Sequence, residues 1–244
     1  MIPKGVYKYC RPPGGHAIAV SPEYFGQTDR QVHGYLLCSG CEQILSSGGE
    51  AWLLPLLAEY KGPFPFYDIL TRFEPELVDG DTAGYAAARN PDILCDKLTH
   101  FAMGIFFKAA VHSWRGRKTE PMINLGPYRE AVRAFLRSEK DFPAHMALTI
   151  GVMPVPVKLA TLEYPVRGNE NRWHYFSFYV PGIRFVLAVG KSLSAGLRHA
   201  CFVRHPAHPI IVKDFSSGMM LAILETINSS GKMKQFEKLA KDIK

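Results

Sequence analysis

The chain has 244 residues, of which 47% are hydrophobic and 21% are charged. This is the composition of a globular protein, and it excludes a disordered or fibrous chain. Its 29 Lys and Arg outnumber its 22 Asp and Glu, and the formal net charge is +7. An excess of cations favours contact with a polyanion, because neutralised phosphates release their counterions.

The hydrophobic residues are not gathered into a membrane anchor or a leader peptide. No stretch of about 18 uncharged apolar residues is present, and Met1-Ile2-Pro3-Lys4 lacks the apolar run of a signal peptide. The five cysteines are an odd number scattered along the chain, unlike the dense, even set of a secreted disulfide scaffold. We therefore expect a cytoplasmic protein with reduced thiols and no membrane contact.

The N-terminal quarter of the chain is expected to form a small module. Residues 1–50 are rich in Gly, Pro, Ser and Tyr and have no helical apolar period, so they predict loops around a cysteine knuckle. A short helix broken or started by Pro55 follows, and the prolines at 63 and 65 favour extended neighbours. We place the boundary near residues 61–68, which predicts a module at 1–60 and a larger domain at 68–244.

Two helices are predicted in the middle of the chain. After a capping Asn90 or Asp92, apolar residues recur at offsets of four and three as far as about Trp114. The recurring residues are Leu94, Leu98, Phe101, Ile105 and Ala109. A solvated turn rich in cations follows, and a second helix is predicted over 126–139, with Pro127 near its first position.

The C-terminal half changes to a strand-forming composition. Residues 173–180 and 183–190 predict an antiparallel hairpin joined through Pro181-Gly182, and the prolines at 154 and 156 make 153–157 an edge or bulged strand. A helix is predicted over 216–228, and an amphipathic helix with a basic face is predicted in the tail. The fold class is therefore α+β: a small zinc-knuckle module, a helical segment, and an antiparallel sheet with a C-terminal amphipathic helix.

The most specific chemical motif is Cys38-Ser39-Gly40-Cys41. Two thiolates separated by two residues on a tight turn have the spacing that a tetrahedral structural zinc needs, and Gly40 would ease the reversal of the chain. One such pair is half a site. The remaining ligands would come from Cys10 and His16, or from His33, whereas the alternative is two ordinary buried cysteines in a turn.

Two segments carry a resemblance to a known family. Residues 1–9, MIPKGVYKY, and 35–53, YLLCSGCEQILSSGGEAWL, resemble small, mostly uncharacterised bacterial and phage proteins. Those proteins open with a CxxC, continue through a Ser-His-hydrophobic-Ile-Pro-Lys segment and then have LLCxxCE, and their N-terminal region looks like an HNH, or treble-clef, zinc finger. The segments HSWRG and NLGPYREAVRAFL resemble their downstream region, so the likeness covers about residues 1–140.

The resemblance implies structural zinc more than catalysis. Cys38 and Cys41 match the second CxxC of the family, and Glu42 matches the Glu that follows it. The first CxxC and the general-base His of the family would lie upstream of Met1, and an HNH nuclease needs that His to activate water. We therefore expect negligible nuclease activity. The alternative is an active HNH endonuclease that uses His16 or His33 as its base.

Other polar clusters give weaker signals. His199, His205 and His208, with Cys201, predict either a second metal or phosphate site or a solvated loop, and the loop is the simpler interpretation. His100 and His112 are expected to be hydrogen-bonded histidines on the flank of a helix. The acidic residues at 74, 76, 79 and 81 are expected to lie in a solvated polar loop.

The cations define a candidate nucleic-acid surface. The candidate phosphate contacts are Arg115, Arg117, Lys232, Lys234, Lys238 and Lys241. The tail could pack on its own core, lie on nucleic acid, or seat in a groove of a partner. The leading hypothesis is a nucleic-acid-associated protein with a degenerate HNH-like zinc finger, acting with a protein partner. The alternatives are the active endonuclease and a purely protein-interaction subunit.

Overall fold

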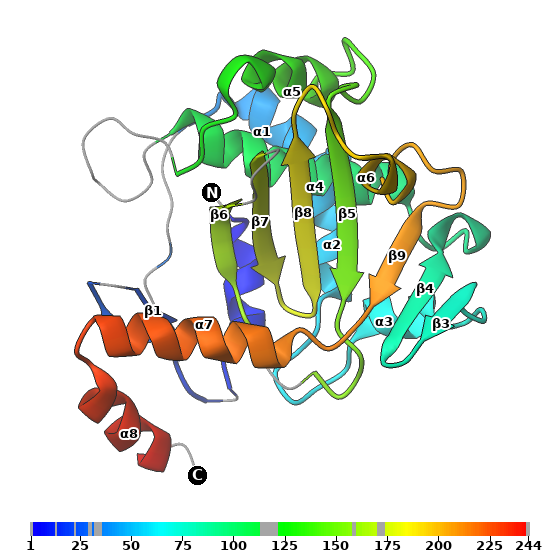
Figure 1. Ribbon diagram of the computed structural model, residues 1–244. Helices are drawn as coiled ribbons and strands as arrows, with labels where there is room; N and C mark the ends of the chain where they lie inside the picture. Colours follow the sequence, from blue (N-terminus) through cyan, green and yellow to red (C-terminus); the bar gives the residue numbers. More distant parts are fainter. Residues whose placement is uncertain are drawn as a thin grey trace.

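The chain folds around a sheet of seven strands, which the computed structural model shows with helices packed along one face (Figure 1). The structure describes residues 2–242 except 13, 22, 29–30, 32–35, 113–121, 158–159 and 170–173, and leaves out the side chains of 169 and 239–242. In sheet order the strands are β3 (Leu77–Asp79), β4 (Thr82–Ala86), β9 (Pro209–Val212), β5 (Met146–Val152), β8 (Ile183–Val189), β7 (His174–Val180) and β6 (Glu163–Asn169). Neighbouring strands are antiparallel except β5 and β9, which are parallel.

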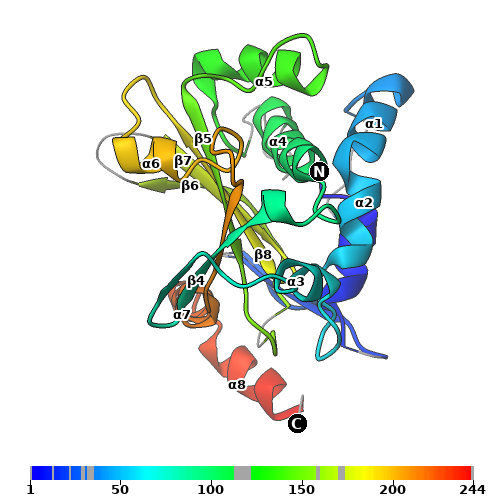
Figure 2. The same ribbon diagram turned by 90° about the vertical axis from the view of Figure 1, so that its right-hand side faces the viewer.

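One face of this sheet is covered by a layer of helices, which Figure 2 shows edge-on. The layer consists of α1 (Ser39–Leu45), η2 (Ser46–Glu50), α2 (Ala51–Leu53), η3 (Leu54–Leu56), α3 (Pro65–Leu70), α4 (Cys95–Val111), η5 (Gly126–Tyr128) and α5 (Arg129–Leu136). The remaining elements are η1 (Lys4–Cys10), β1 (Ala17–Val20), β2 (Phe25–Thr28), η4 (Ala87–Arg89), α6 (Ala195–His199), α7 (Ser216–Ser229) and α8 (Met233–Asp242). The α+β class predicted from the sequence is confirmed.

The main core lies between α4 and the central strands. Phe106 of α4 packs edge-on against Phe178 of β7 at 5.0 Å between ring centroids, and Phe178 stacks on Phe185 of β8 at 4.9 Å. The helical period of α4 directs Leu98, Phe101, Ile105 and Ala109 to this core. Leu94 is 41% exposed, because it caps the helix instead of belonging to it. The predicted buried helix is confirmed, with its first residue at Cys95.

A second helical segment crosses α4 closely. Residues 39–56 run through α1, η2, α2 and η3, and η2 is a π-helical turn. A Cβ on Gly49 would lie 2.4 Å from the carbonyl oxygen of Lys97, so only glycine lets the two backbones approach so closely. The prediction of loops throughout residues 1–50 was therefore wrong. The helical segment was not recognisable in the sequence, because a close contact made by glycine adds no apolar residue to a helical period.

Several other local predictions have clear outcomes. The β7–β8 hairpin is confirmed, with Gly182 at φ +85° in its turn, as are the helices predicted over 126–139, 216–228 and in the tail. Residues 153–157 are not a strand, because the prolines follow the end of β5, which is a central strand. The polar loop expected around residues 74–81 contributes β3 and the turn of the β3–β4 hairpin. Pro65 begins α3, where its fixed φ suits the first helical turn.

The predicted domain boundary lies within a shared core. Ile2, Val6 and Tyr7 belong to the same hydrophobic cluster as the buried residues of the strands, and the hydroxyls of Tyr7 and Tyr164 lie 2.9 Å apart. Whether residues 1–60 fold as a unit of their own stays a prediction. In the described part of the chain, no helix is both long enough and apolar enough to cross a membrane.

Candidate functional site

The cysteine pair lies at the start of α1. Cys38 is the N-cap residue, its carbonyl accepts a hydrogen bond from the backbone N–H of Glu42 at 3.0 Å, and Cys41 lies in the first turn. The motif is therefore helical and not the tight turn that we predicted, and nothing lies within 4 Å of a Cβ placed on Gly40. Cys38 is exposed and Cys41 half-buried, so they are not two buried core cysteines.

The two thiols are electrostatically unequal. The pKa of Cys38 is lowered, mainly because its sulfur accepts hydrogen bonds from the backbone N–H and the thiol of Cys41. The pKa of Cys41 is raised, chiefly because its thiol donates to Cys38, whereas the nearby charge of Arg137 acts in the opposite direction. A thiolate at this site consequently forms first on Cys38, the side chain that faces water.

The other predicted zinc ligands do not join this pair. Cys10 ends η1 with its thiol 4.0 Å from the carbonyl of Val6, and burial raises its pKa to about 12. His16 is exposed just before β1, and His33 lies outside the described residues. Within the described residues, no three His, Cys, Asp or Glu side chains form a group that could hold a metal. The zinc site stays a prediction.

Glu42, which follows the cysteine pair, takes part in an ion-pair cluster. Lys108 of α4 is buried, and its Nζ donates to Glu50 of η2 at 2.8 Å and lies 4.0 Å from the carboxylate of Glu42. A buried cation needs such partners, because desolvation of an unpaired charge is costly. These contacts tie α1 and η2 to α4, so they give Glu42 a structural role.

The histidine segment is exposed in part, at His199 and Arg204, as expected for a solvated loop, and it is packed in part. The rings of His199 and His205 meet at 4.8 Å, His208 Nδ1 lies 2.7 Å from the carbonyl oxygen of Phe202, and Cys201 is fully buried. The guanidinium of Arg204 lies over the ring of Phe142 at 5.4 Å. These contacts account for the cluster as local structure.

His100 and His112 have different positions. His100 Nε2 lies 3.1 Å from the carbonyl oxygen of Leu136, whereas its Nδ1 is buried without a hydrogen-bond partner in the structure. A Cβ on Gly48 would lie 2.3 Å from that Nδ1, so the atom faces the glycine backbone. Only one ring nitrogen of His100 is therefore hydrogen-bonded, whereas we expected a fully hydrogen-bonded histidine. His112 is the residue directly after α4.

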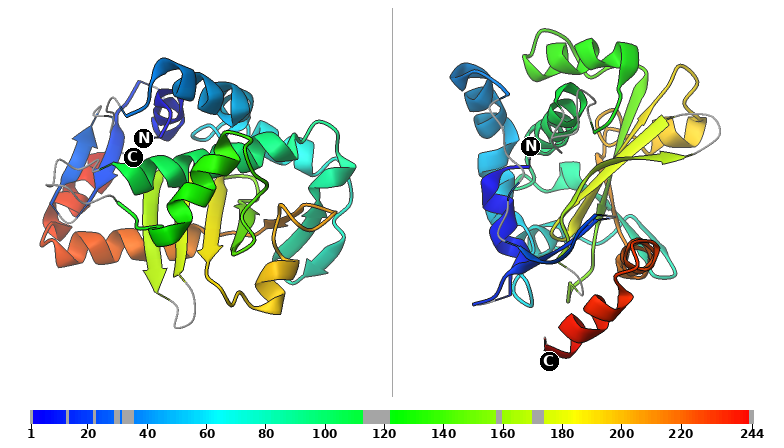
Figure 3. Two further views of the ribbon diagram at one scale, coloured as in Figure 1. Left: turned by 90° about the horizontal axis from the view of Figure 1, so that it is seen from above. Right: turned by 90° about the vertical axis from the view of Figure 1, so that its left-hand side faces the viewer.

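The basic tail is docked by its apolar side. The ring of Phe236 in α8 meets the ring of Phe25 in β2 at 5.9 Å, and Figure 3 shows α8 beside the β1–β2 hairpin. Lys234 and Lys238 are exposed, whereas Lys232 Nζ is buried without a hydrogen-bond partner in the structure. The side chain of Lys241, together with Arg115 and Arg117, falls outside the described part.

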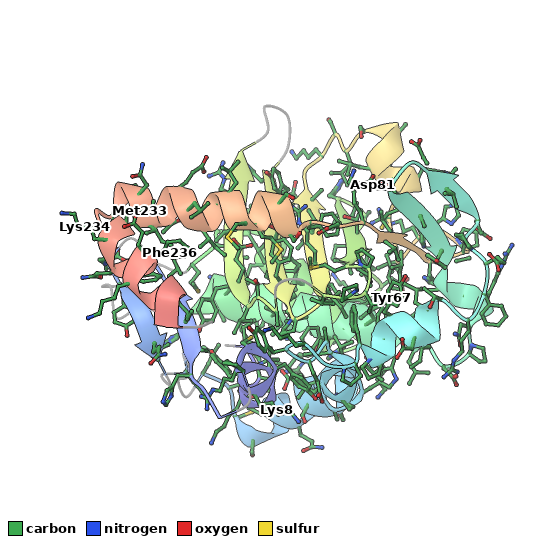
Figure 4. All side chains as sticks on the ribbon, turned by 90° about the horizontal axis from the view of Figure 1, so that it is seen from below. Lys8, Tyr67, Asp81, Met233, Lys234 and Phe236 are labelled. Atoms are coloured by element: carbon green, nitrogen blue, oxygen red, sulfur yellow. The ribbon has the colours of Figure 1, made fainter. Side chains whose placement is uncertain are left out.

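Two further cations lie at the same end of the molecule. Lys4 and Lys8 of η1 are both exposed, and Figure 4 shows Lys8 and Lys234 on either side of the β1–β2 hairpin. Sequence reasoning missed them, because residues 1–50 were expected to form loops and the 3-10 helix η1 was not predicted. We call Lys4, Lys8, Lys234 and Lys238 the basic surface.

Comparison with known proteins adds no relative, because no protein-family model, curated protein or solved structure matches the chain. The likeness of residues 1–140 to HNH-like proteins thus rests on the motifs alone.

Proposed function

We propose that this protein associates with nucleic acid through its basic surface. The observation that carries the proposal is the way in which α8 is held: Phe236 packs on Phe25 while Lys234 and Lys238 remain exposed. Anchoring fixes the position of the helix, so its lysines lose less conformational freedom when they meet phosphates. The net charge of +7 acts in the same direction.

A protein partner would supply the chemistry or the targeting. Among the described residues, no three His, Cys, Asp or Glu side chains form a group that could hold a catalytic metal. The resemblance brings no catalytic residue to this chain. We therefore expect negligible cleavage of plasmid or single-stranded substrates with magnesium, manganese or zinc. Metal-dependent cleavage that is abolished by His16→Ala or His33→Ala would replace the proposal with an active endonuclease.

The degenerate HNH-like finger is part of the same proposal. Cys38 and Cys41 would be two thiolate ligands of a structural zinc, and the lowered pKa of Cys38 favours the ligating form. We expect about one zinc per chain in protein purified without chelators. Cys38→Ser should lower the zinc content measured by plasma mass spectrometry. Cys10→Ser tests whether the buried thiol takes part, and a chain free of zinc would refute the site.

The main experiment measures nucleic-acid affinity as a function of salt. Each lost phosphate contact flattens the slope of log K against log salt by about 0.9 on duplex DNA, so Lys234→Gln with Lys238→Gln should flatten it by about 1.8. Lys232→Gln should leave the slope unchanged, because the Nζ of Lys232 is buried. Fluorescence anisotropy with a labelled duplex provides the readout.

A matched control uses cations at the other end of the molecule. Arg129 and Lys140 are exposed in and just after α5, which Figure 1 places far from α8. The double variant Arg129→Gln/Lys140→Gln should bind as the unmodified protein does. If the tail variant also binds unchanged, α8 is only a docking helix. If the unmodified protein binds no nucleic acid at moderate salt, the protein-interaction function replaces the proposal.

A further inference from the structure

The face of the sheet opposite α4 has an unusual composition. Because side chains alternate along a strand, Phe176, Phe178 and Val180 point to the main core, and Tyr175 and Tyr179 point away from it. On the neighbouring strands the same open face carries Arg184, Val186, Ala188, Ala147, Thr149 and Gly151. Among the described elements, Figures 1 and 2 show α7 across one end of this face and α6 near the other.

The phenol end of Tyr175 lies over the backbone of β6 on this open face. Its partner across the β6–β7 ladder is Gly168, and a Cβ on Gly168 would fall 1.8 Å from Cζ of the Tyr175 ring. The glycine thus makes room for the ring to lie on the backbone of β6. The tyrosine is partly exposed, and a ring that rests on the sheet presents its other side outward. Such a ring is a stacking platform for a flat ligand.

At the end of the open face that α7 crosses, side chains of the protein itself cover the sheet. Arg184 lies over the rings of Tyr179 at 5.4 Å and Phe215 at 5.6 Å, and Phe215 fills the space above Gly151. The charge of Arg184 opposes the effect of burial on the pKa of Glu163 across the sheet. Arg184 and Phe215 cover this end of the face, so the usable surface is the part around Tyr175.

Cations border that part of the surface. Leu193 packs on Ala147 and Ala188 of the open face, so the segment from Lys191 to α6 lies on this side of the sheet. Lys191 and Arg198 are exposed there. Ala188 is the cross-strand partner of Tyr175, and three residues of chain place the Lys191 backbone within about 11 Å of it. A positive border beside an aromatic ring complements a strand of phosphates and bases.

We propose that this face binds single-stranded nucleic acid, with a base stacked on Tyr175 and phosphates near Lys191 and Arg198. The inference rests on the proposed function and names its substrate class. Bases in a duplex are stacked on each other and cannot lie on a protein ring, whereas unpaired bases can. In the next cross-strand row, Val186 and Thr149 are partly exposed beside Ser177, and this partly polar surface suits ligands of varied sequence.

The test compares a labelled dT 12-mer with a labelled duplex of the same length. The unmodified protein should bind the single strand more tightly. Tyr175→Leu should weaken that binding by about 5- to 140-fold, the effect of losing one stacked base. Tyr175→Phe should stay within about threefold, because it keeps the ring. Tyr60→Leu is the matched control, since Tyr60 is a half-buried tyrosine just after η3, outside the sheet.

The phosphate contacts are tested by variants that carry little risk of unfolding. Lys191→Gln with Arg198→Gln should flatten the salt slope for the single strand by about 1.4, whereas Tyr175→Leu should leave the slope unchanged. Unchanged single-strand affinity in Tyr175→Leu, with an intact circular dichroism spectrum, would overturn this inference and leave the basic surface of α8 as the binding site. If the unmodified protein binds neither probe at low salt, the proposed function fails as well.

Discussion

The two faces of the central sheet have opposite characters, although they are made by the same strands. On the α4 face, Phe178 and Phe185 are fully buried in an aromatic cluster. On the open face, the alternate residues of β7 are Tyr175, Ser177 and Tyr179, which are polar at their tips. The large aromatic core is thus concentrated on one face, whereas the other face is covered only in part, by the α6 segment and by Phe215.

Ionisable groups sharpen the contrast. On the helix-covered side, the buried Lys108 is paired with Glu50 at 2.8 Å. On the open side, Glu163 is partly buried and its pKa is raised, chiefly by desolvation, which the charge of Arg184 offsets only in part. Protein surfaces that bind ligands commonly keep such imperfectly satisfied groups.

Truncating a core ring on the α4 face should have the largest effect. Phe178→Ala removes the ring that contacts both Phe106 and Phe185, and we expect a loss of about 3–5 kcal/mol in the free energy of unfolding, measured with urea. Thr149→Ala, on the open face of the central strand β5, should cost less than about 1 kcal/mol. Similar losses for both variants would contradict the division between the faces.

The glycine crossing between η2 and α4 should be nearly as sensitive. Gly49→Ala would place its Cβ 2.4 Å from Lys97 O and 2.7 Å from Phe101 N, both backbone atoms. Separating the two helices should cost about 1–3 kcal/mol. Gly40→Ala is the matched control in α1, where the Cβ meets nothing within 4 Å, and it should stabilise the protein by up to about 1 kcal/mol. Equal effects would mean that the crossing is looser than described.

Replacing Glu163 should have a smaller effect of opposite sign. A carboxyl whose folded pKa is raised above its ordinary value near 4.5 contributes stability below that pH and loses it as pH rises through the folded pKa. Glu163→Gln should therefore raise the melting temperature slightly at pH 7. The difference from the unmodified protein should disappear near pH 4. A destabilised variant at pH 7 would show that the contact with Arg184 outweighs desolvation.

The smallest effect concerns the rates at which the cysteines react, which report the part of the open face that is shielded from solvent. Cys201 is fully buried beneath the α6 segment, whereas Cys38 is exposed with a lowered pKa. Iodoacetamide at pH 7 should label Cys38 at least about tenfold faster than Cys201, as read by peptide mass spectrometry. Fast labelling of Cys201 would mean that α6 does not close this end of the face.

The candidate surfaces were predictable only in part. The cysteine pair and the lysines of the tail were recognisable in the sequence, because a CxxC spacing and an amphipathic pattern are local features. The platform at Tyr175 was not recognised. Alternation along β7 indicates two faces but not which one the helices cover, and the space above Gly168 depends on the pairing of β6 with β7.

The sequence by itself determined the elements whose signal is local. The period of Leu98, Phe101 and Ile105 determined α4, and Pro181-Gly182 between two apolar runs determined the β7–β8 hairpin. Only the tertiary structure decided the crossing of η2 over α4, the parallel pairing of β5 with β9, and the open face itself. These features depend on contacts between residues far apart in the chain, and local residue patterns do not predict such contacts.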